Sequence, residues 1–149
     1  MYKTVQRRRF ILIILLISLA ILLFARCASE NRRALTRARS APDIVRFLGT
    51  FGWEVEAEPV SVKNLQIPAK FTPVYERYNA LQKQQGFDLS KYRADIVESY
   101  SFRVLNHPAD SDVFANVLIF KGRVIGGDIC SFAIDGFMTG FDGRLTLSG

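Results

Sequence analysis

The chain has 149 residues, 49% of them hydrophobic, and a formal net charge of +6. Residues 1–39 hold nine Lys/Arg and one acid (+8), whereas residues 40–149 hold eleven bases and thirteen acids (−2). The pI near 9.6 therefore describes the N-terminal flank and excludes a nucleic-acid-binding domain in the remainder. The 12 Phe and 5 Tyr also exclude a disordered chain.

An unbroken apolar run extends from Phe10 to Ala25. As a helix rising about 1.5 Å per residue it covers roughly 24 Å, against about 30 Å of bilayer hydrocarbon. Arginine stems that reach back to the headgroups, together with modest thinning of the bilayer, can cover the difference. The run therefore predicts a transmembrane anchor that contacts the lipid bilayer. The membrane-flanking residues are Arg7, Arg8, Arg9 and Arg26.

Three other interpretations of this run stay open. A cleaved secretory signal would need small residues at the cleavage site, and Arg26 and Cys27 fit that pattern poorly. A lipid-modified Cys27 would follow a small residue, but here it follows Arg26. A buried helix in a soluble protein would need a large core, because this run is apolar all round.

The anchor divides the chain into four parts. They are a basic N-terminal tail (1–9), the transmembrane anchor (10–25), a basic juxtamembrane spacer (26–40) and one globular domain (41–149). Lys and Arg counts on the two sides of the anchor do not decide its orientation. A short basic tail before a first apolar segment favours a signal anchor with the tail inside and the domain exported, so we expect a single-pass plasma-membrane protein with an extracytoplasmic domain.

Two helices are predicted in the domain. The first starts after Ser40, which can act as its cap, and ends near Gly49 to Gly52. The second runs from about Pro73 to Gln85, with Gly86 at its C-terminal cap.

Strand patterns fill most of the rest. Trp53 to Ile67 alternates polar and apolar residues as one edge strand or two short ones, and the ranges 96–105, 113–120 and 124–133 predict an antiparallel meander with a turn at 121–122. Gly126 and Gly127 indicate a bulge or a close approach of the second helix. The tail, 135–149, is predicted as a loop covering the sheet and ending in a short strand at 145–147. The fold class is α+β, with two helices packed on one face of an antiparallel sheet of about four strands.

Four segments of the domain stand out as a set. They are Phe51-Gly52-Trp53-Glu54-Val55, Tyr78-Asn79-x-Leu81-Gln82-x-x-Gln85-Gly86-Phe87-Asp88-Leu89, Gly122-Arg123-Val124-Ile125-Gly126-Gly127-Asp128-Ile129-Cys130 and Asp135-Gly136-Phe137-Met138. Together they resemble a family of small bacterial proteins, of Gram-positive type, that carry a domain of unknown function behind one N-terminal membrane segment. The resemblance covers about residues 42 to 142 and implies a single-pass anchored protein, with no activity to carry over.

No combination of residues in this sequence strongly indicates a catalytic site. A thiol enzyme would combine Cys130 with His107 and Asp128, but Cys130 lies in an apolar run that favours a buried, inert thiol. A cell-wall hydrolase would use two carboxylates from Asp128, Asp135 and Asp142, although Asp beside Gly more often forms turns. We predict no catalytic residue, no metal site and no cofactor.

The predicted function is a membrane-anchored extracytoplasmic binding or interaction module for an envelope protein or a cell-wall ligand. Its candidate binding residues are Trp53, Asp128 and Asp135. The alternatives are the carboxylate hydrolase and an accessory subunit of a membrane complex.

Overall fold

The computed structural model describes residues 14, 17–21, 36–108, 112–133 and 136–143. The chain forms two compact units, Met1–Leu35 and Thr36–Gly149. In the first unit residues 17–21 are helical, and the side chains of Ile17, Leu19 and Ile21 are more than half exposed. Among the described residues, no helix is both long and apolar enough to cross a membrane. Most of the predicted anchor lies outside those residues, as do the four flanking arginines.

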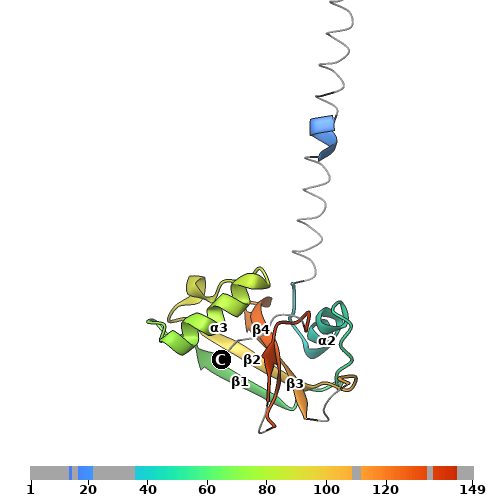
Figure 1. The fold of residues 1–149 in the computed structure, drawn as a ribbon, viewed down its shortest axis with the longest axis vertical. Helices are drawn as coiled ribbons and strands as arrows, with labels where there is room; N and C mark the ends of the chain where they lie inside the picture. The colour runs from blue at the N-terminus through green and yellow to red at the C-terminus, as the bar shows by residue number, and fades with distance from the viewer. Residues whose placement is uncertain (1–13, 15–16, 22–35, 109–111, 134–135, 144–149) are drawn as a thin grey trace, which may run out of the picture. The chain divides into compact units, whose positions relative to one another are not determined.

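The described part of the second unit contains two α-helices, one 3-10 helix and five strands. Figure 1 shows how its helices and strands are arranged. The two α-helices begin and end as predicted, and a 3-10 helix lies between the second α-helix and the meander. In chain order the elements are α2 (Ala41–Gly49), β1 (Ser61–Gln66), α3 (Pro73–Gln84), η1 (Leu89–Tyr92), β2 (Ile96–Arg103), β3 (Val113–Phe120), β4 (Arg123–Ser131) and β5 (Met138–Thr139).

The strands form one antiparallel sheet in the order β1-β2-β3-β4-β5. The predicted meander is confirmed, and so is its tight turn, where Lys121 and Gly122 both have positive φ, 49° and 71°. The sheet has five strands instead of about four, because Met138 and Thr139 pair with the end of β4. The strand predicted at 145–147 lies outside the described residues.

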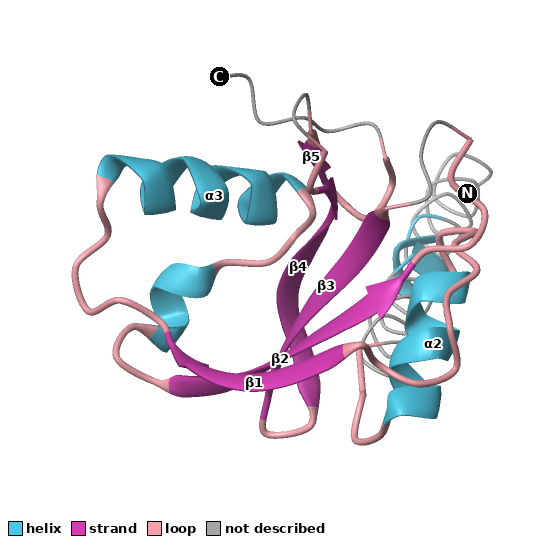
Figure 2. Cartoon of the chain, turned by 90° about the horizontal axis from the view of Figure 1, so that it is seen from below, coloured by secondary structure: helices cyan, strands magenta, loops and turns pink. Residues whose placement is uncertain are grey.

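The two α-helices lie against opposite faces of the sheet (Figure 2), so the prediction that both pack on one face is wrong. Neighbouring residues of β3 demonstrate this, because successive side chains of a strand point to opposite faces. Val117 packs in the same cluster as Ile44 and Phe47 of α2, whereas Leu118 packs in the cluster that includes Tyr78 of α3. Each helix therefore has its own core.

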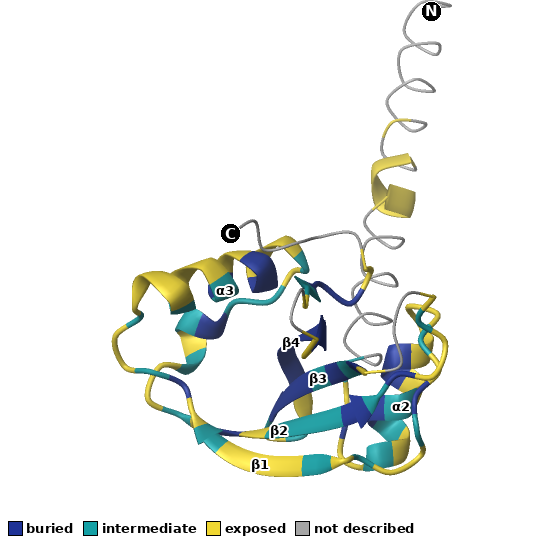
Figure 3. Cartoon of the chain, turned by 60° about the horizontal axis from the view of Figure 1, so that its bottom comes forward, coloured by how far each residue is buried: buried dark blue, intermediate teal, exposed yellow. Residues whose placement is uncertain are grey.

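Burial is deepest in β3 and β4, which lie between the two helices (Figure 3). The core on the α2 side is larger, and it also contains Phe141 from the C-terminal segment, only 1% exposed. Its buried members are Ala38, Ile44, Phe47, Leu48, Val55, Phe102, Val104, Val113, Ala115, Val117, Ile119, Val124, Ile129 and Phe141. The core on the α3 side consists of Ile67, Leu89, Val97, Leu118 and Ile125.

Both explanations offered for Gly126 and Gly127 are correct. The pairing of β3 with β4 shifts register between Leu118 and Ile119, which makes a bulge beside the two glycines. The helix α3 also approaches closely, since a Cβ on Gly126 would lie 2.8 Å from Oε1 of Gln82. Small residues are therefore required here for both pairing and helix packing.

The start of the unit also joins the sheet. In the segment predicted as a spacer, the amide of Ala38 donates to the carbonyl of Gly122, and the amide of Val124 donates to the carbonyl of Thr36. Ala38 is 2% exposed. At the start of α2 the side chain of Ser40 makes no capping bond, and the Asp43 carboxylate instead accepts the amide of Arg39.

Candidate functional site

A row of polar side chains crosses the α3 side of the sheet. Ser61 pairs with Ser101, Ser101 pairs with Asn116, and Asn116 pairs with Asp128, one residue from each of β1 to β4. Directly paired residues share a face, so these side chains form one line across four strands. We call these four residues the polar row. Ser61, Ser101 and Asn116 are half-buried, and Asp128 is 3% exposed.

Hydrogen bonds connect the polar row to α3. The Ser101 hydroxyl donates to Oδ1 of Asn116 at 2.6 Å, and Nδ2 of Asn116 donates to Oδ1 of Asp128 at 2.8 Å. The hydroxyl of Tyr78, from α3, donates to Oδ2 of Asp128 at 2.8 Å. The hydrogen bonds of the polar row therefore all run in one direction, from the half-buried hydroxyl of Ser101 through Asn116 to the buried carboxyl group of Asp128.

Burial has the largest effect on the pKa of Asp128. Loss of solvent raises its pKa above the ordinary value of 3.8, while hydrogen bonds from Asn116, Tyr78 and Cys130 act in the opposite direction. Burial, and then the nearby Asp128 carboxylate, hold the pKa of Tyr78 well above its ordinary value. The phenol therefore stays protonated and serves as a hydrogen-bond donor.

Cys130 lies beside the polar row, and its thiol is expected to be unreactive. It is 4% exposed, and Nδ2 of Asn116 lies 3.2 Å from its Sγ. Burial, and then the Asp128 carboxylate, raise the pKa of Cys130 to about 12. Because the thiolate is the reactive form, a protonated thiol argues against the nucleophilic role considered for Cys130. The expectation of a small buried residue is confirmed.

Gln82 of α3 and Gln85, the C-cap residue of that helix, fix the helix onto β4 next to Asp128. Oε1 of Gln82 accepts the Gly127 amide at 2.8 Å, and Nε2 of Gln85 donates to the Gly127 carbonyl at 3.0 Å. Oε1 of Gln85 also accepts the Phe141 amide at 2.7 Å. Among the described residues, Nε2 of Gln82 is the one buried side-chain N or O atom without a hydrogen-bond partner. It is a donor that an ordered water or a ligand can satisfy.

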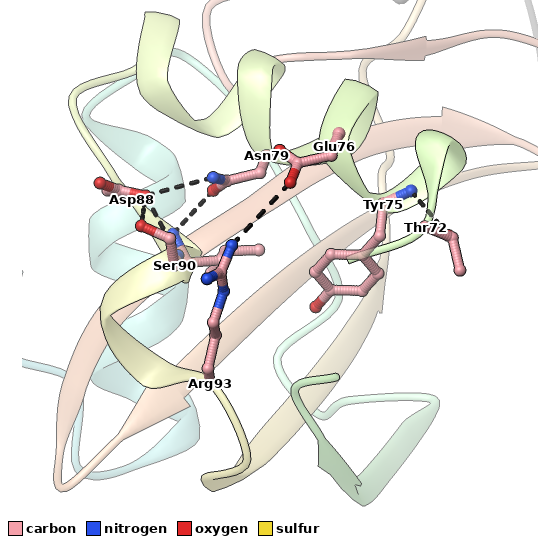
Figure 4. A network of polar contacts seen from close by, with 8 residues as sticks. Thr72, Tyr75, Glu76, Asn79, Asp88, Ser90 and Arg93 are labelled. Atoms are coloured by element: carbon pink, nitrogen blue, oxygen red, sulfur yellow. Dashed lines mark hydrogen bonds and ion pairs between the residues drawn. The ribbon is translucent and has the colours of Figure 1, made fainter. Parts of the chain in front are cut away.

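Besides its contacts with β4, α3 is connected to η1 by the polar contacts shown in Figure 4. Asn79, 1% exposed, accepts the Leu89 amide at 2.8 Å and donates to Asp88 at 3.2 Å. Asp88 in turn accepts the hydroxyl and the amide of Ser90, and these bonds hold its pKa down at about 2. This network fixes the position of α3, and so of Tyr78 above the polar row.

Trp53 belongs to another part of the domain. Its indole N–H donates to the Phe141 carbonyl at 2.6 Å, and its half-buried ring packs against the α2-side core. The His107 ring stacks with the rings of Trp53 and Phe137, with centroid distances of 5.9 and 5.0 Å. The structure thus places Trp53 and Asp128 in different clusters, and packing accounts for Trp53.

The other predicted carboxylates are less informative. Asp135 lies outside the described residues, and Asp142 is exposed. Within the described ranges no group of His, Cys, Asp and Glu could hold a metal ion. Of the three candidate binding residues, only Asp128 takes part in the polar row.

Sequence reasoning missed Ser61, Ser101 and Asn116 of the polar row, and also Tyr78. One signal was available, because Asn116 interrupts the apolar run of β3 and a polar residue within a buried strand needs a partner. The partner itself depends on strand register, which the sequence does not display.

Comparisons with known proteins place this domain in a family. The model of a family described as a domain of unknown function, DUF4830, matches residues 47–129. The matched range includes β1 to β3, nearly all of β4, and every residue of the polar row. Comparisons with curated proteins and with solved structures found no match. Because the matched range covers more than half of the 149 residues, the chain belongs to the DUF4830 family.

Proposed function

We infer that this chain is a membrane-tethered binding module whose ligand-binding surface is the polar row on the α3 side of the sheet. In the proposed arrangement, Phe10 to Ala25 anchors the chain in the plasma membrane of a bacterium. The domain faces the extracytoplasmic side, where it binds a component of the cell envelope.

The observation that carries the proposal is the polarity of this sheet face. A face used only for packing would carry apolar side chains, yet four consecutive strands place Ser, Ser, Asn and Asp in one line. The α3-side core fills one end of the face, around Val97 and Leu118. Ser61, Ser101 and Asn116 remain partly accessible, so their remaining hydrogen-bonding capacity can reach a ligand.

The chemistry of the row supports a neutral, hydroxyl-rich ligand such as a cell-wall glycan. Its accessible members are uncharged hydroxyl and amide groups, and its acid is buried and already bonded to Tyr78 and Asn116. The half-buried ring of Phe114 lies one row farther along the same face, opposite Arg103. Flat aromatic rings next to hydrogen-bonding groups suit the mixed apolar and polar surface of a sugar.

The proposed membrane anchor is supported by the apolar run in the sequence and by the part of that run that the structure describes. Residues 17–21 are helical, and Ile17, Leu19 and Ile21 expose more than half of their surface. Exposed apolar side chains on a helix are unfavourable in water and are stabilised in hydrocarbon. Because the run from Phe10 to Ala25 is apolar on every side, it favours a lipid-facing helix over a helix with one face packed on a small protein core.

Binding is tested with the full chain in detergent micelles and purified, insoluble peptidoglycan as the probe. We expect the wild type to sediment with the probe. Ser101→Ala should weaken binding roughly two- to tenfold, as expected for one lost hydrogen bond. Ser61→Trp, which fills the accessible end of the row without removing a bond to Asn116, should abolish binding. Gln84→Ala, an exposed amide on α3, is the matched control.

Each variant is first compared with the wild type by urea denaturation, so that loss of fold is separated from loss of binding. Equal sedimentation of wild type and Ser61→Trp would show that the row is not the binding surface. Absence of wild-type sedimentation would rule out a cell-wall glycan as the ligand.

A further inference from the structure

The buried acid of the polar row fixes which way its hydrogen bonds run. Nδ2 of Asn116 donates to Oδ1 of Asp128 at 2.8 Å, so the amide oxygen of Asn116 faces the other way and accepts the Ser101 hydroxyl at 2.6 Å. An ionised carboxylate can only accept, and it therefore decides which end of the Asn116 amide faces it. The Ser101 proton is committed to Asn116, and the half-buried Ser101 oxygen offers lone pairs on its accessible side.

A proton on Asp128 reverses this order. Tyr78 already donates to Oδ2 at 2.8 Å, which leaves Oδ1 as the oxygen that carries the proton and donates it. To accept that proton the side-chain amide of Asn116 turns over, so that its oxygen faces Asp128 and its nitrogen faces Ser101. Ser101 then accepts from Asn116, and its own proton is free to be donated on the accessible side. The backbone does not move, and each of the three bonds keeps a donor and an acceptor.

The surroundings of Asp128 suit such a switch. Burial raises the pKa of Asp128 above its ordinary value of 3.8. The titratable groups bonded to it are Tyr78 of α3, whose pKa is well above its ordinary value, and Cys130 of β4, whose pKa is about 12. Both stay protonated at acid and neutral pH. The cations on this face, Lys63 of β1 and Arg103 of β2, each lie two positions along their strands from the polar row.

We propose, on the basis that the polar row is the ligand-binding surface, that its binding is controlled by the proton on Asp128. The ionised carboxylate sets Ser101 to accept a hydrogen bond from the ligand, and the neutral acid sets it to donate one. A ligand hydroxyl can turn to suit either state, whereas an amide N–H, as in the acetamido groups of a cell-wall glycan, can only donate. The row therefore binds such N–H groups in the ionised state and loses that bond as the pH falls.

The switch is tested without a ligand, by NMR of the full chain in detergent micelles between about pH 4 and 8. The carboxyl carbon of Asp128 should titrate with a midpoint above 3.8. With the same midpoint, the nuclear Overhauser contacts from the Nδ2 protons of Asn116 to the Hβ protons of Ser101 should strengthen as the pH falls, which a change of charge alone would not produce. An Asn116 amide that keeps its contacts while Asp128 titrates, or an Asp128 without a midpoint above 3.8, would overturn the switch whether or not the chain binds a glycan.

The effect on binding is tested by sedimentation with insoluble peptidoglycan over the same pH range. The wild type should bind about three- to tenfold more weakly below the midpoint than above it, as expected for one lost hydrogen bond. Asp128→Asn can donate to Asn116 at every pH, and so should bind as weakly as the protonated wild type throughout. Ser101→Ala lacks the responding hydroxyl and should show no pH dependence. Ser99→Ala removes a half-buried serine of β2 outside the polar row and should keep it.

The outcomes separate this proposal from the proposed function. Equal wild-type binding on both sides of the midpoint, or a pH dependence that survives in Asp128→Asn, would overturn control by Asp128. Tighter binding at low pH would overturn the assignment of Ser101 as the acceptor in the binding state. Absence of wild-type sedimentation at every pH would reject the cell-wall glycan as the ligand, and the NMR contacts of Asn116 would then decide the switch by themselves.

Discussion

Gln85, the C-cap residue of α3, donates from Nε2 to the carbonyl oxygen of Gly127 in β4 at 3.0 Å, and so satisfies a backbone group at the edge of the sheet as a neighbouring strand would. The same side chain accepts the Phe141 amide, which ties the C-terminal segment to the helix. The α3 helix is thus fixed to the sheet edge through backbone groups, and its attachment depends on a position without a side chain.

Gly127→Ala should destabilise the domain by about 2–4 kcal/mol. A Cβ at this position would lie 2.1 Å from the carbonyl oxygen of Asn116 and 2.4 Å from the ring of Phe141, and φ is +154°. Urea denaturation measures the change. Gly49→Ala is the matched control, since a Cβ there meets nothing within 4 Å at the end of α2, and we expect it to be neutral or slightly stabilising. Equal effects of the two substitutions would contradict the close packing at Gly127.

Tyr78→Phe should cost about 1–3 kcal/mol, because it removes a donor from the buried Asp128 and leaves Oδ2 without that bond. The free energy of unfolding at neutral pH is the measurement. Tyr92→Phe keeps a ring that packs against Phe120 at 5.3 Å and should change stability less. A Tyr78→Phe variant as stable as the wild type would show that the bond from α3 to the polar row contributes nothing.

Asp128 should make stability depend on pH in the unusual direction for a carboxyl group. Its pKa is raised on folding, so its contribution is fully present below the unfolded value of 3.8 and declines as pH rises through the folded pKa. Asp128→Asn should therefore gain stability relative to the wild type as pH increases from about 4 to 7. Urea midpoints over a pH series measure this difference, and a difference independent of pH would contradict it.

Asp88 provides the opposite case in the same experiment. Its pKa is lowered to about 2, chiefly by the bonds from Ser90 and Asn79. Its contribution is present above the unfolded value of 3.8 and is lost as pH falls toward about 2. We expect Asp88→Asn to lose less stability than the wild type over that acid range. An identical acid response would show that these bonds do not favour the ionised form.

Cys130 should resist thiol reagents in the folded protein. It is 4% exposed, and its pKa of about 12 leaves almost no thiolate at neutral pH. In a Cys27→Ser background, a chromogenic disulfide reagent should react only after urea is added. Rapid reaction of the native protein would indicate an accessible, activated thiol and would revive the catalytic role considered for it.

Lys70→Cys tests the orientation of the domain. The residue is exposed between β1 and α3, and in a Cys27→Ser background a membrane-impermeant maleimide should label it in intact cells. Thr4→Cys, in the basic tail, should be labelled only after lysis. The reverse pattern would place the domain in the cytoplasm and remove the proposed cell-wall ligand.

Local signals in the sequence predicted local structure well. The Lys121-Gly122 turn was predictable, because two residues between β-rich runs need positive φ and glycine adopts it freely. Both α-helices were predictable from the residues at their ends and from apolar periodicity, although the Ser40 side chain makes no capping bond. These features depend on residues only a few positions apart.

The remaining features depend on pairs distant in sequence. The placement of α2 and α3 on opposite faces follows from which face of β3 each helix covers, and periodicity does not encode this choice. The polar row exists because Ser101, Asn116 and Asp128 fall in register. A shift of one residue would separate their side chains onto opposite faces, and short-range patterns do not fix register.

The burial of Phe141 also bears on where the folding unit ends. The family match stops at residue 129 and begins within α2, at residue 47. Phe141 and Ile44, each 1% exposed, lie outside it on either side. A fragment cut to the matched range would lose both side chains, expose the apolar surface around Phe102 and leave the Gln85 amide without its partner at Phe141. The part of the chain that is recognisable as a family is thus shorter than the part that must fold together, which extends at least from Thr36 to Gly143.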